Sequence, residues 1–497
     1  MATTANFLAV DLGASGGRVL LGRWDGARFA LQELHRFPNG GVAVLGHLHW
    51  DVLHLWQEIQ TGFARYAAQE GTPPAGIGVD SWAVDFGLLD AEGRLLGNPY
   101  HYRDRRTDGV PAHVFERLPW PDIFARTGIQ LLPFNTLYQV AAMAREHAAQ
   151  LAAAKTLLLI PDLLGYWLTG RQAAEYTNAS TTQMLDCHTR TWASDMLARL
   201  GLPGELLPPL LTAGAQLGEL QPEVAASAGL RGAIPVFAPG THDTASAVAA
   251  VPGLNERSAF ISSGTWSLVG VELPSPLVND ATLASNVTNE GGVFDTIRLL
   301  KNVAGLWLVQ ECQRRWQQDG RQYSWEELQE LARSTPPLRS LIDPDAIDFL
   351  HPTDMPAALV GYCRSHGEPA PDSVGSIVRC CLESIALQYR SVLEVLETLT
   401  GRRIDTLRVV GGGSRNRLLC QWTADACRRP VIAGPVEATA LGNILVQAIA
   451  AGHLTDLAAG RQAIAASVEV QHYVPNPEMA RQWDDAFLRS RTLKEPA

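Results

Sequence analysis

Residues 7–22, FLAVDLGASGGRVLLG, contain side chains whose spacing is compatible with two different chemistries. Residues 13–17 match the pattern G-x-S-x-G, in which a serine on a sharp turn between a strand and a helix is the nucleophile of a hydrolase. The same letters also describe an acidic residue at the end of one strand, followed by a glycine-rich turn into a second strand. In that interpretation the turn binds phosphate through its backbone amides, and Asp11 faces a metal ion.

The segment that follows Ser15 decides against the hydrolase. A nucleophile of that kind needs a helix immediately behind it. Residues 18–24, RVLLGRW, instead contain an apolar run with the β-branched Val19 and a glycine close by, which predicts a strand. We therefore expect Ser15 to be one hydrogen-bond donor in a phosphate-binding turn. A plain tight hairpin, with Asp11 capping its amides, is the alternative.

Glycine at positions 13, 16 and 17 suits a phosphate-binding turn. Without a Cβ atom, these residues let the backbone approach an anion closely, and they permit positive φ angles. Consecutive amides in such a turn form a concave anion site. Asp11 at the strand end would face the Mg²⁺ that accompanies the phosphate, because hard cations prefer oxygen ligands.

A second turn of the same kind lies about half a chain away. Residues 262–270, SSGTWSLVG, again place a turn of Gly, Ser and Thr between two strand-like runs. An ordinary hairpin is the alternative for either turn alone, but two such turns predict a duplicated architecture of two similar α/β halves. Loops at the strand ends of such halves form a cleft in which ligands bind.

Residues 241–247, THDTASA, follow a short strand and begin an alanine-rich helix. A carboxylate at a helix N-terminus stays ionised, as a general base must. Asp243 is therefore a candidate to accept the proton of a hydroxyl group that attacks the γ-phosphate of a nucleotide. The alternatives are that Asp243 or Thr241 caps the helix and that His242 is a packed core residue.

Residues 409–416, VVGGGSRN, place three glycines directly after a strand. Bare backbone at this point would let a flat adenine ring lie close to the chain. The alternative is a loop that leads into a helix capped by Ser414 or Asn416. The Walker A pattern is absent from the sequence, which excludes a P-loop enzyme.

Periodicity and turn residues predict the elements that position these side chains. The first forty residues read as a meander of three strands, and apolar positions at helical spacing predict a helix over residues 54–69. Strands return over residues 76–97, and the region from about 120 to 230 is mostly helical. A long amphipathic helix ends at Gly401 and is followed by alternating strands and helices. We therefore expect mixed or parallel sheets covered by helices.

Composition limits the class of protein. A chain of 497 residues suggests roughly two to four domains. Its net charge of −11 argues against a general nucleic-acid binder, because no net positive field attracts the phosphate backbone. The N-terminus has no secretory signal pattern, and no uninterrupted apolar run approaches the roughly 18 residues of a membrane span. We therefore expect a soluble, cytoplasmic protein that binds neither nucleic acid nor membrane.

Seven cysteines are present, and none forms a C-x-x-C pair, so the sequence predicts neither a zinc ribbon nor a thioredoxin-type site. Free thiols are expected in a reducing cytosol. Whether Cys363 and Cys380 pair is left open.

Ordered motifs extend over nearly the whole chain, from residue 8 to about residue 445. They are AVDLGASGGRV, GVDSWAVDF, YRDRRT, GIQLLPFNTLYQ, EYTNASTTQ, THDTASAV, SSGTWSLVG, NEGG, LKNVAGLWLVQ and VIAGPVEATALGN. Together they resemble the FGGY carbohydrate kinases of the sugar kinase, heat-shock-protein and actin superfamily. The resemblance implies an α/β fold of two ribonuclease H-like, actin-like ATPase domains, residues 1–248 and 249–497, with a catalytic cleft between them.

The resemblance also implies phosphorylation of L-rhamnulose at its 1-hydroxyl by MgATP, with sugar and phosphate bound by the first domain and nucleotide by the second. Position by position, it assigns ATP binding to Ala14, Ser15, Gly16, Gly17, Arg18, Thr265, Gln310, Gly411 and Gly412. It assigns sugar binding to Ala83, His242, Asp243, Thr244 and Asn302. Asp243 would be the proton acceptor, and Asp11 would face Mg²⁺. The implied partners are a small-molecule sugar and ATP, and the expected state is a monomer or a small homo-oligomer.

Two departures from the family pattern affect these assignments. Many superfamily relatives have more Thr and Ser in the first phosphate turn, whereas only Ser15 supplies a hydroxyl here. Ala83 stands where related kinases carry glycine, and its methyl group would narrow the sugar pocket. The resemblance therefore constrains the reaction type more than the substrate. A kinase for another ketose or deoxy sugar, such as L-fuculose or L-xylulose, and a slow ATP-binding scaffold of the actin type remain as alternatives.

Overall fold

The computed structural model describes residues 4–350 and 352–493. By their contacts, these residues divide into two units, and each unit is assembled from separate stretches of the chain. The first unit comprises the residues up to Gly253, Glu272–Leu299 and Ala438–Val468. The second comprises Leu254–Val271, Leu300–Glu437 and the residues from Glu469 on.

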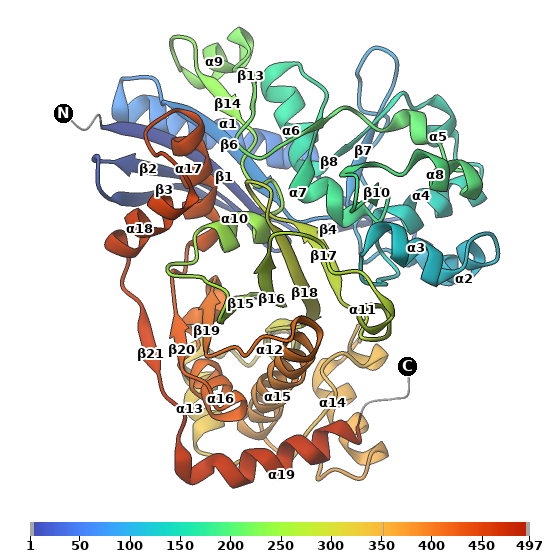
Figure 1. Cartoon of the computed structure of the whole chain (residues 1–497), viewed down its shortest axis with the longest axis vertical. Coiled ribbons are helices and arrows are strands. Elements are labelled where there is room, and N and C mark those ends of the chain that lie inside the picture. The colour runs from blue at the N-terminus through green and yellow to red at the C-terminus, as the bar shows by residue number, and fades with distance from the viewer. Residues whose placement is uncertain (1–3, 351, 494–497) are drawn as a thin grey trace. The chain divides into compact units, whose positions relative to one another are not determined.

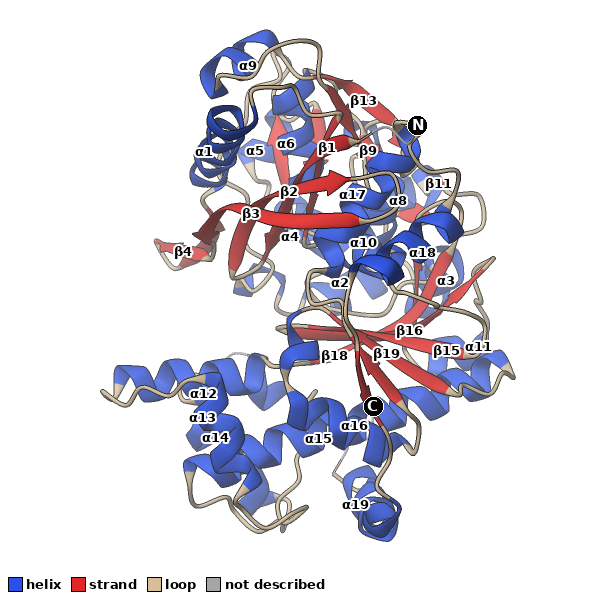
Figure 2. Cartoon of the chain, turned by 90° about the vertical axis from the view of Figure 1, so that its left-hand side faces the viewer, coloured by secondary structure: helices blue, strands red, loops and turns tan. Residues whose placement is uncertain are grey.

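The first unit is built on a six-stranded sheet with the order β13-β14-β6-β1-β2-β3. Its strands are β1 (Ala5–Gly13), β2 (Gly16–Trp24), β3 (Phe29–Pro38), β6 (Gly76–Ser81), β13 (Gln216–Glu219) and β14 (Pro235–Phe237). The first three form the expected antiparallel meander, which Figure 2 shows as neighbouring red arrows. β6 lies parallel to β1, and β14 lies parallel to β6. The carboxyl ends of three neighbouring strands therefore meet at one edge.

Helices cover both faces of this sheet because its central strands are mostly apolar, apart from acidic residues near their carboxyl ends. On one face α1 (Val52–Glu70) brings Gly62 against Val19, and on the other Gly22 meets Ile444 of α17 (Ala438–Ala450). Val19 and Gly22 are three residues apart on β2, so they point to opposite faces. Figure 1 shows α17 beside α10 (Asp243–Ala249), the helix that begins at the candidate base. α6 (Ile160–Thr169) also packs on β6.

The rest of the first unit is a collection of short elements. Its other helices are α2 (Val110–Phe115), α3 (Trp120–Thr127), α4 (Thr136–Arg145), α5 (Ala149–Ala153), α7 (Tyr176–Ala179), α8 (Ser194–Leu200), α9 (Pro222–Ala228), α11 (Asp280–Ala284) and α18 (Leu457–Ser467). Its short strand pairs are β4 (Gly41–Val44) with β5 (His47–Trp50), β7 (Phe86–Leu89) with β8 (Thr156–Leu159), β9 (Ala174–Glu175) with β12 (Leu210–Leu211) and β10 (Leu185–Asp186) with β11 (Thr191–Trp192). The region predicted to be mostly helical therefore also contains short strands, which are too short for periodicity to reveal.

A second sheet has the order β17-β18-β16-β15-β19-β20-β21. Its strands are β15 (Ser258–Ser263), β16 (Trp266–Leu273), β17 (Thr288–Gly291), β18 (Ile297–Ala304), β19 (Thr406–Val410), β20 (Val431–Ala433) and β21 (Gln471–Tyr473). β15 and β16 form an antiparallel hairpin, and β19 and then β20 continue the sheet in parallel with β15.

Both sheets follow one pattern. In each, the first strand of a hairpin has two successive parallel neighbours, and an antiparallel strand closes that edge. The two glycine- and serine-containing turns of the sequence occupy the equivalent position in this pattern, between β1 and β2 and between β15 and β16. The duplicated architecture predicted from those turns is therefore confirmed in the strand topology.

Helices pack around the second sheet. They are α12 (Trp307–Gln318), α13 (Trp325–Arg333), α14 (Met355–Ser365), α15 (Val374–Thr400), α16 (Arg417–Cys427) and α19 (Ala480–Arg491). α15 is the long amphipathic helix predicted from the sequence. It begins with a capping box at Ser373 and ends at Gly401 with a left-handed φ of 65°.

All seven cysteines are buried free thiols. The Cys363 and Cys380 thiols lie close enough to share a hydrogen bond, which lowers the pKa of Cys363 and raises that of Cys380. The expectation of free thiols therefore agrees with the structure.

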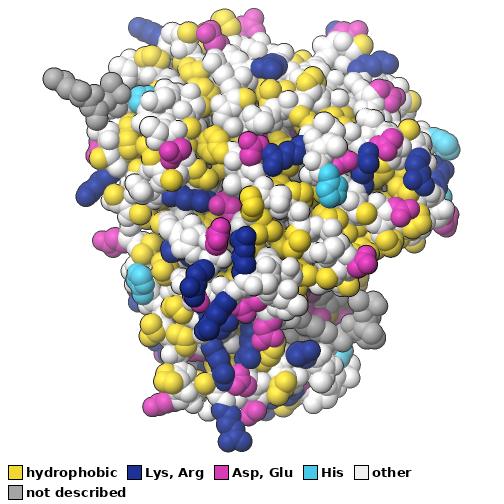
Figure 3. Space-filling view, in the orientation of Figure 1, with side chains coloured by type: hydrophobic (Ala, Val, Ile, Leu, Met, Phe, Trp, Pro, Cys, Tyr) yellow, Lys and Arg dark blue, Asp and Glu magenta, His cyan; other side chains and the backbone are white. Residues whose placement is uncertain are grey.

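The described residues include no helix that is long and apolar enough to cross a membrane. On the face shown in Figure 3, Lys and Arg side chains alternate with Asp and Glu side chains.

Candidate active site

Three carboxylates lie near one another at the carboxyl edge of the first sheet, those of Asp11, Asp80 and Asp243. Asp11 and Asp80 are direct neighbours in the parallel register of β1 and β6. Asp11 accepts a hydrogen bond from Arg18 Nη2 at 2.5 Å, and Asp80 accepts one from Asn443 Nδ2 at 2.5 Å. Burial raises the pKa of Asp80 well above its usual range, and the charges of Asp11 and Asp243 raise it further. Asp80 thus prefers its protonated form next to two other acids.

The turn after Asp11 is a two-residue hairpin loop. Gly13 pairs with Gly16, so Ala14 and the exposed Ser15 form the loop, and β2 follows directly. Asn39 Nδ2 donates to the Gly13 carbonyl at 2.8 Å. A strand in this place removes the hydrolase interpretation, which needs a helix.

The expected role of the three glycines needs a correction. None of Gly13, Gly16 and Gly17 has a positive φ angle. A Cβ atom at Gly17 would overlap the ring of Phe37, so this glycine makes room for packing between β2 and β3. At Gly13 and Gly16 an added Cβ would meet only a carbonyl oxygen at 3.4 Å, an ordinary contact. Unobstructed backbone, and not left-handed geometry, is what the turn offers to an anion.

The candidate base is the first residue of α10. His242 occupies the cap position of the helix, so neither Thr241 nor Asp243 is the cap that the structural alternative required. Thr244 Oγ1 donates to Asp243 Oδ1 at 3.1 Å, and the Asp243 side chain is 30 % exposed. Loss of surrounding water raises the pKa of Asp243, while His242, Thr244 and Arg298 oppose that effect. A carboxylate that is reachable and more basic than usual suits proton transfer.

His242 lies between Asp243 and a buried ion pair. Its Nε2 is 3.5 Å from Asp243 Oδ1, and its Nδ1 is 3.1 Å from Arg298 Nη2 and 3.3 Å from Glu290 Oε2. Arg298 Nη2 also lies 3.2 Å from Glu290 Oε2. His242 is therefore a buried histidine, as the structural alternative held, and it also contacts the candidate base.

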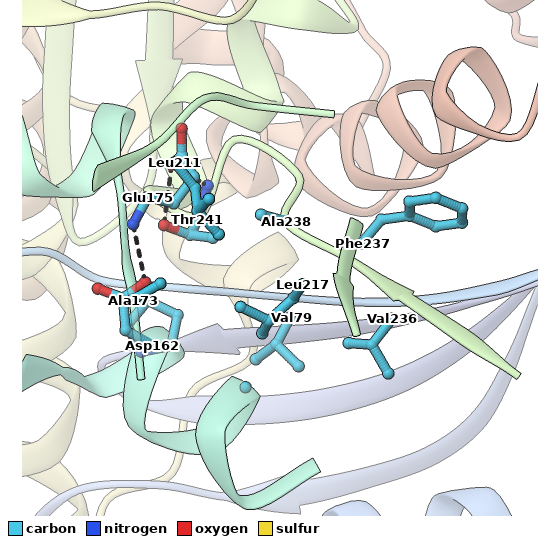
Figure 4. A pocket seen from close by; sticks show the side chains of 12 residues that line it. Val79, Asp162, Ala173, Glu175, Leu211, Leu217, Val236, Phe237, Ala238 and Thr241 are labelled. Atoms are coloured by element: carbon cyan, nitrogen blue, oxygen red, sulfur yellow. Dashed lines mark hydrogen bonds between the residues drawn. The ribbon is translucent and has the colours of Figure 1, made fainter. Parts of the chain in front are cut away.

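A buried glutamate holds the loop that leads to the base. Glu175 accepts hydrogen bonds from the Thr241 backbone amide and hydroxyl, both at 2.9 Å, and from Thr177 Oγ1 at 2.5 Å. The His242 amide donates to Thr177 Oγ1 at 3.3 Å. Figure 4 shows Glu175 beside Thr241, with Asp162 of α6 below them. The Glu175 carboxylate thus fixes the backbone at Thr241, two residues before Asp243.

The loop that carries Ala83 is strained and tightly held. Val84 has a φ of 68°, which a β-branched residue rarely adopts. Thr136 Oγ1 donates to the Val84 carbonyl at 2.7 Å, and the Asp85 amide donates to the Ala83 carbonyl at 2.9 Å. Asp85, whose pKa burial raises to about 6, accepts bonds from the indole of Trp82 and from three other groups. Such strain is typical of ligand-binding loops.

Four of the residues predicted to bind nucleotide lie in the second unit: Thr265, Gln310, Gly411 and Gly412. The turn at Gly264 and Thr265 accepts backbone hydrogen bonds from the Leu306 amide at 2.9 Å and the Trp307 amide at 3.1 Å. It therefore docks on the first turn of α12, the helix that carries Gln310. Asn302, a predicted sugar contact, lies on β18.

The glycine run after β19 lies against the end of β15. Gly411 has a φ of 82°, and a Cβ atom there would come within 3.0 Å of the Ser263 carbonyl. A Cβ atom at Gly413 would overlap Ser263 Oγ, whereas one at Gly412 would meet nothing within 4 Å. Asn416 caps α16 through the Leu419 amide at 3.0 Å, as the structural alternative for this loop predicted. Gly412 is the position at which a ligand has open backbone.

The carboxylates of the first unit fit a cation that arrives with phosphate. Within residues 4–350 and 352–493 no group of three or more His, Cys, Asp or Glu side chains forms a metal cage. Mg²⁺ in phosphoryl-transfer enzymes is held by one or two carboxylates together with phosphate oxygens and waters. Asp11 would supply one such oxygen ligand, and the rest of the coordination would come from the nucleotide and water.

Four residues of this arrangement were not among those that the sequence singled out: Asp80, Glu175, Glu290 and Arg298. For Asp80, Glu290 and Arg298 the signal was a charged residue inside an otherwise apolar or glycine-rich motif, in GVDS, NEGG and IRLL. Glu175 lies in the polar motif EYTN and carried no such signal. Charged residues are rarely fully buried unless they are paired.

Comparison with known proteins gives the family. Residues 6–250 match the N-terminal domain and residues 259–451 match the C-terminal domain of the FGGY family of carbohydrate kinases. A Bacteroides thetaiotaomicron protein named rhamnulokinase is 47 % identical over 483 residues, which cover 97 % of this chain and 98 % of that protein. Rhamnulokinases of Pectobacterium atrosepticum and Enterococcus faecalis are 45 % and 43 % identical, and the matches cover 97 % or more of each chain.

Solved structures agree in fold. The ligand-bound xylulose kinase of Lactobacillus acidophilus superposes with a TM-score of 0.80 at 16 % identity, over 98 % of this chain and 97 % of that one. The Plasmodium falciparum glycerol kinase with ADP superposes with a TM-score of 0.77 at 16 % identity, over 99 % of both chains. The two-domain, actin-like ATPase fold implied by the sequence motifs is confirmed. With both family domains matched in order, this chain belongs to the FGGY family of carbohydrate kinases.

Proposed function

We propose that this chain transfers the γ-phosphate of ATP to the 1-hydroxyl of L-rhamnulose, giving L-rhamnulose 1-phosphate and ADP, in L-rhamnose catabolism. Three relatives that are 43 % to 47 % identical over nearly their whole length carry the name rhamnulokinase, which supports this substrate. The observation that carries the reaction type is the position of Asp243, reachable at the start of α10 and held in place by its neighbours.

In the proposed reaction the sugar O1–H bond breaks as its proton passes to Asp243. O1 forms a bond to the γ-phosphorus, and the bond from that phosphorus to the bridging oxygen breaks, so that ADP leaves with the electron pair. Mg²⁺, when bound with ATP, neutralises phosphate charge, and Asp11 is the residue that would hold it. Ala83, His242, Thr244 and Asn302 would orient the sugar.

We assign sugar and phosphate binding to residues 1–248 and nucleotide binding mainly to residues 249–497. Phosphate contacts would come from the first turn, Ala14 to Arg18, and from Thr265, and the remaining nucleotide contacts from Gln310, Gly411 and Gly412. Backbone amides carry most of the contact in the first turn, because Ser15 is its one hydroxyl-bearing residue. We further propose a cytoplasmic enzyme, a monomer or small homo-oligomer, with no nucleic-acid or membrane partner.

The test has two parts, both measured by a coupled assay of ADP release. The parent enzyme is assayed with a panel of ketoses, and Asp243→Asn is assayed beside the parent. L-rhamnulose is expected to give the highest kcat/KM, above L-fuculose and L-xylulose, and Asp243→Asn is expected to fold normally and lose about 10³-fold or more in kcat. Asp122→Asn, which changes an exposed acid in the first turn of α3, is the matched control and should keep parental rates.

Near-parental turnover of Asp243→Asn would remove this residue as the base. A higher kcat/KM for another ketose would change the substrate and leave the reaction type in place. ADP release that does not depend on any sugar would favour the ATP-binding scaffold.

A further inference from the structure

We propose that Arg298 and Glu290 form a positioning pair that acts through His242. The pair fixes which ring nitrogen of His242 carries the hydrogen that faces Asp243, and it thereby sets how readily Asp243 accepts a proton. This inference rests on the proposed role of Asp243. Neither Arg298 nor Glu290 is assigned to sugar, nucleotide or metal.

The pair is built into the fold and not exposed to solvent. Arg298 is fully buried on β18, and Glu290 is 4 % exposed on β17. Arg298 Nε donates to the Gly291 carbonyl at 3.0 Å, which fixes the orientation of the guanidinium group. Its Nη2 then lies 3.1 Å from His242 Nδ1 and 3.2 Å from Glu290 Oε2. A buried charge is costly, so a buried pair aimed at a histidine calls for an explanation.

The chemistry of the guanidinium group fixes the tautomer of His242. Arginine has donors and no acceptor, so His242 Nδ1 must accept the hydrogen bond from Arg298. Glu290 Oε2 also lies 3.3 Å from this nitrogen, but Arg298 Nη2 is the nearer group and itself binds that oxygen at 3.2 Å. The neutral imidazole therefore carries its hydrogen on Nε2, and Nε2 is the atom that lies 3.5 Å from Asp243 Oδ1. His242 thus presents a donor to the carboxylate.

The charges around Asp243 give the pair a second, electrostatic effect. Acidic groups face this region from several elements: Asp11 on β1, Asp80 on β6, Glu175 at the start of α7 and Glu290 on β17. The nearby groups that can carry positive charge are Arg18, which is paired with Asp11, and His242 and Arg298, which both lower the pKa of Asp243. Removal of the Arg298 charge should therefore make Asp243 more basic, and removal of the Glu290 charge should make it less basic.

The experiment measures kcat/KM for L-rhamnulose against pH at saturating ATP. Glu290→Gln is expected to move the acidic limb of the profile to lower pH, and Arg298→Met to higher pH, each by about one unit. Arg298→Lys keeps the charge and should restore the limb to within a few tenths of the parental position. If Arg298 and Glu290 served only to stabilise the fold, both variants would lower kcat, and the acidic limb would not move in opposite directions in the two.

A matched control comes from another Glu–Arg pair of the first unit. Arg461 binds Glu272 with two hydrogen bonds, at 2.9 and 3.0 Å, and also donates to the carbonyls of Val248 and Ala249 at the other end of α10. Glu272→Gln therefore disturbs the same helix without facing Asp243. Its pH profile should keep the parental limb.

The tautomer itself is read without turnover. Long-range ¹⁵N–¹H correlation spectra of the parent protein, with His242→Gln to assign the signal, should show His242 protonated at Nε2 and unprotonated at Nδ1. A hydrogen on Nδ1, or an unmoved limb in Glu290→Gln, would overturn the inference. Turnover by Asp243→Asn would instead remove the proposed base, and the NMR result would still stand.

Discussion

Asp11 and Asp80 are register neighbours on parallel strands β1 and β6, and their carboxylates have different partners. Arg18, a permanent cation, pairs with Asp11, whereas the neutral amide of Asn443 donates to Asp80. Two adjacent carboxylates repel when both are ionised, so the environment separates their roles. Asp11 has a cation beside it, whereas burial and two acidic neighbours raise the pKa of Asp80.

Asp80→Asn should preserve stability and change its dependence on pH. The folded-state pKa of Asp80 is raised above the ordinary 3.8, so the folded chain binds a proton that the unfolded chain releases. The stability from this group is full below about pH 3.8 and is lost as pH rises toward the folded-state pKa. Asparagine mimics the protonated acid, so calorimetric Tm against pH should be flatter for the variant. A lower Tm with an unchanged slope would mean that Asp80 is ionised in the folded state.

Asp11→Asn should weaken the response to Mg²⁺. Loss of one carboxylate ligand is expected to raise the Mg²⁺ concentration for half-maximal activity by about tenfold, measured at fixed ATP. Asp80→Asn is the matched control, since it changes the neighbouring carboxyl to the same amide and should leave the Mg²⁺ titration unchanged. Equal titrations for Asp11→Asn and the parent would contradict the metal role.

Gly442→Ala should destabilise the first unit by about 2–3 kcal/mol. A Cβ atom at Gly442 on α17 would overlap the Ser246 carbonyl of α10, and backbone on both sides cannot yield without moving the helices apart. Because α10 begins at Asp243, kcat should fall as well. Chemical denaturation and steady-state kinetics measure both effects.

The control for that substitution is Gly361→Ala in α14, where an added Cβ meets nothing within 4 Å. Alanine is the better helix former, so this variant should gain about 0.5–1 kcal/mol. A loss at Gly361 of the same size as at Gly442 would show that glycine matters for a reason other than the contact between α10 and α17.

Gly412→Ala should affect nucleotide binding without affecting stability. An added Cβ meets nothing within 4 Å, so the fold tolerates it, while a methyl group on the open backbone would obstruct a bound nucleotide. We expect KM for ATP to rise about fivefold, equivalent to 1 kcal/mol of binding. Gly413→Ala, one residue on, should instead lower Tm, because its Cβ overlaps Ser263 Oγ. An unchanged KM for ATP in Gly412→Ala would separate this loop from the nucleotide.

Local patterns were sufficient to predict most elements that carry the site. The β1–β2 hairpin, α10 with Asp243 at its start and α15 with its stop at Gly401 all follow from apolar periodicity and turn residues that act within a few positions of each other. The contacts of the site were not predictable in this way. Arg298 reaches His242 across 56 positions, and Glu175 reaches Thr241 across 66. Such pairings arise only when the sheets are assembled, because burial and not sequence proximity brings the charges together.

The glycines of the first turn show the same limit. Three glycines in five positions indicated left-handed backbone, but the hairpin closes through Ala14 and Ser15 without it. The missing side chain of Gly17 leaves room for the ring of Phe37, which lies on the neighbouring strand β3. The three glycines indicated a turn that binds through its backbone. They did not indicate which neighbouring side chain fills the space beside Gly17.

The position of α17 in the chain has a consequence for synthesis. This helix, residues 438–450, packs on β1, β6 and α10, although most of the first unit is complete by Gly253. During translation the N-terminal part emerges first. The face of β1 and β6 that α17 covers therefore stays exposed until nearly nine-tenths of the chain has been synthesised. The nascent first half is a natural client for a chaperone, and expression of that half alone should give aggregated protein unless the α17 segment is supplied.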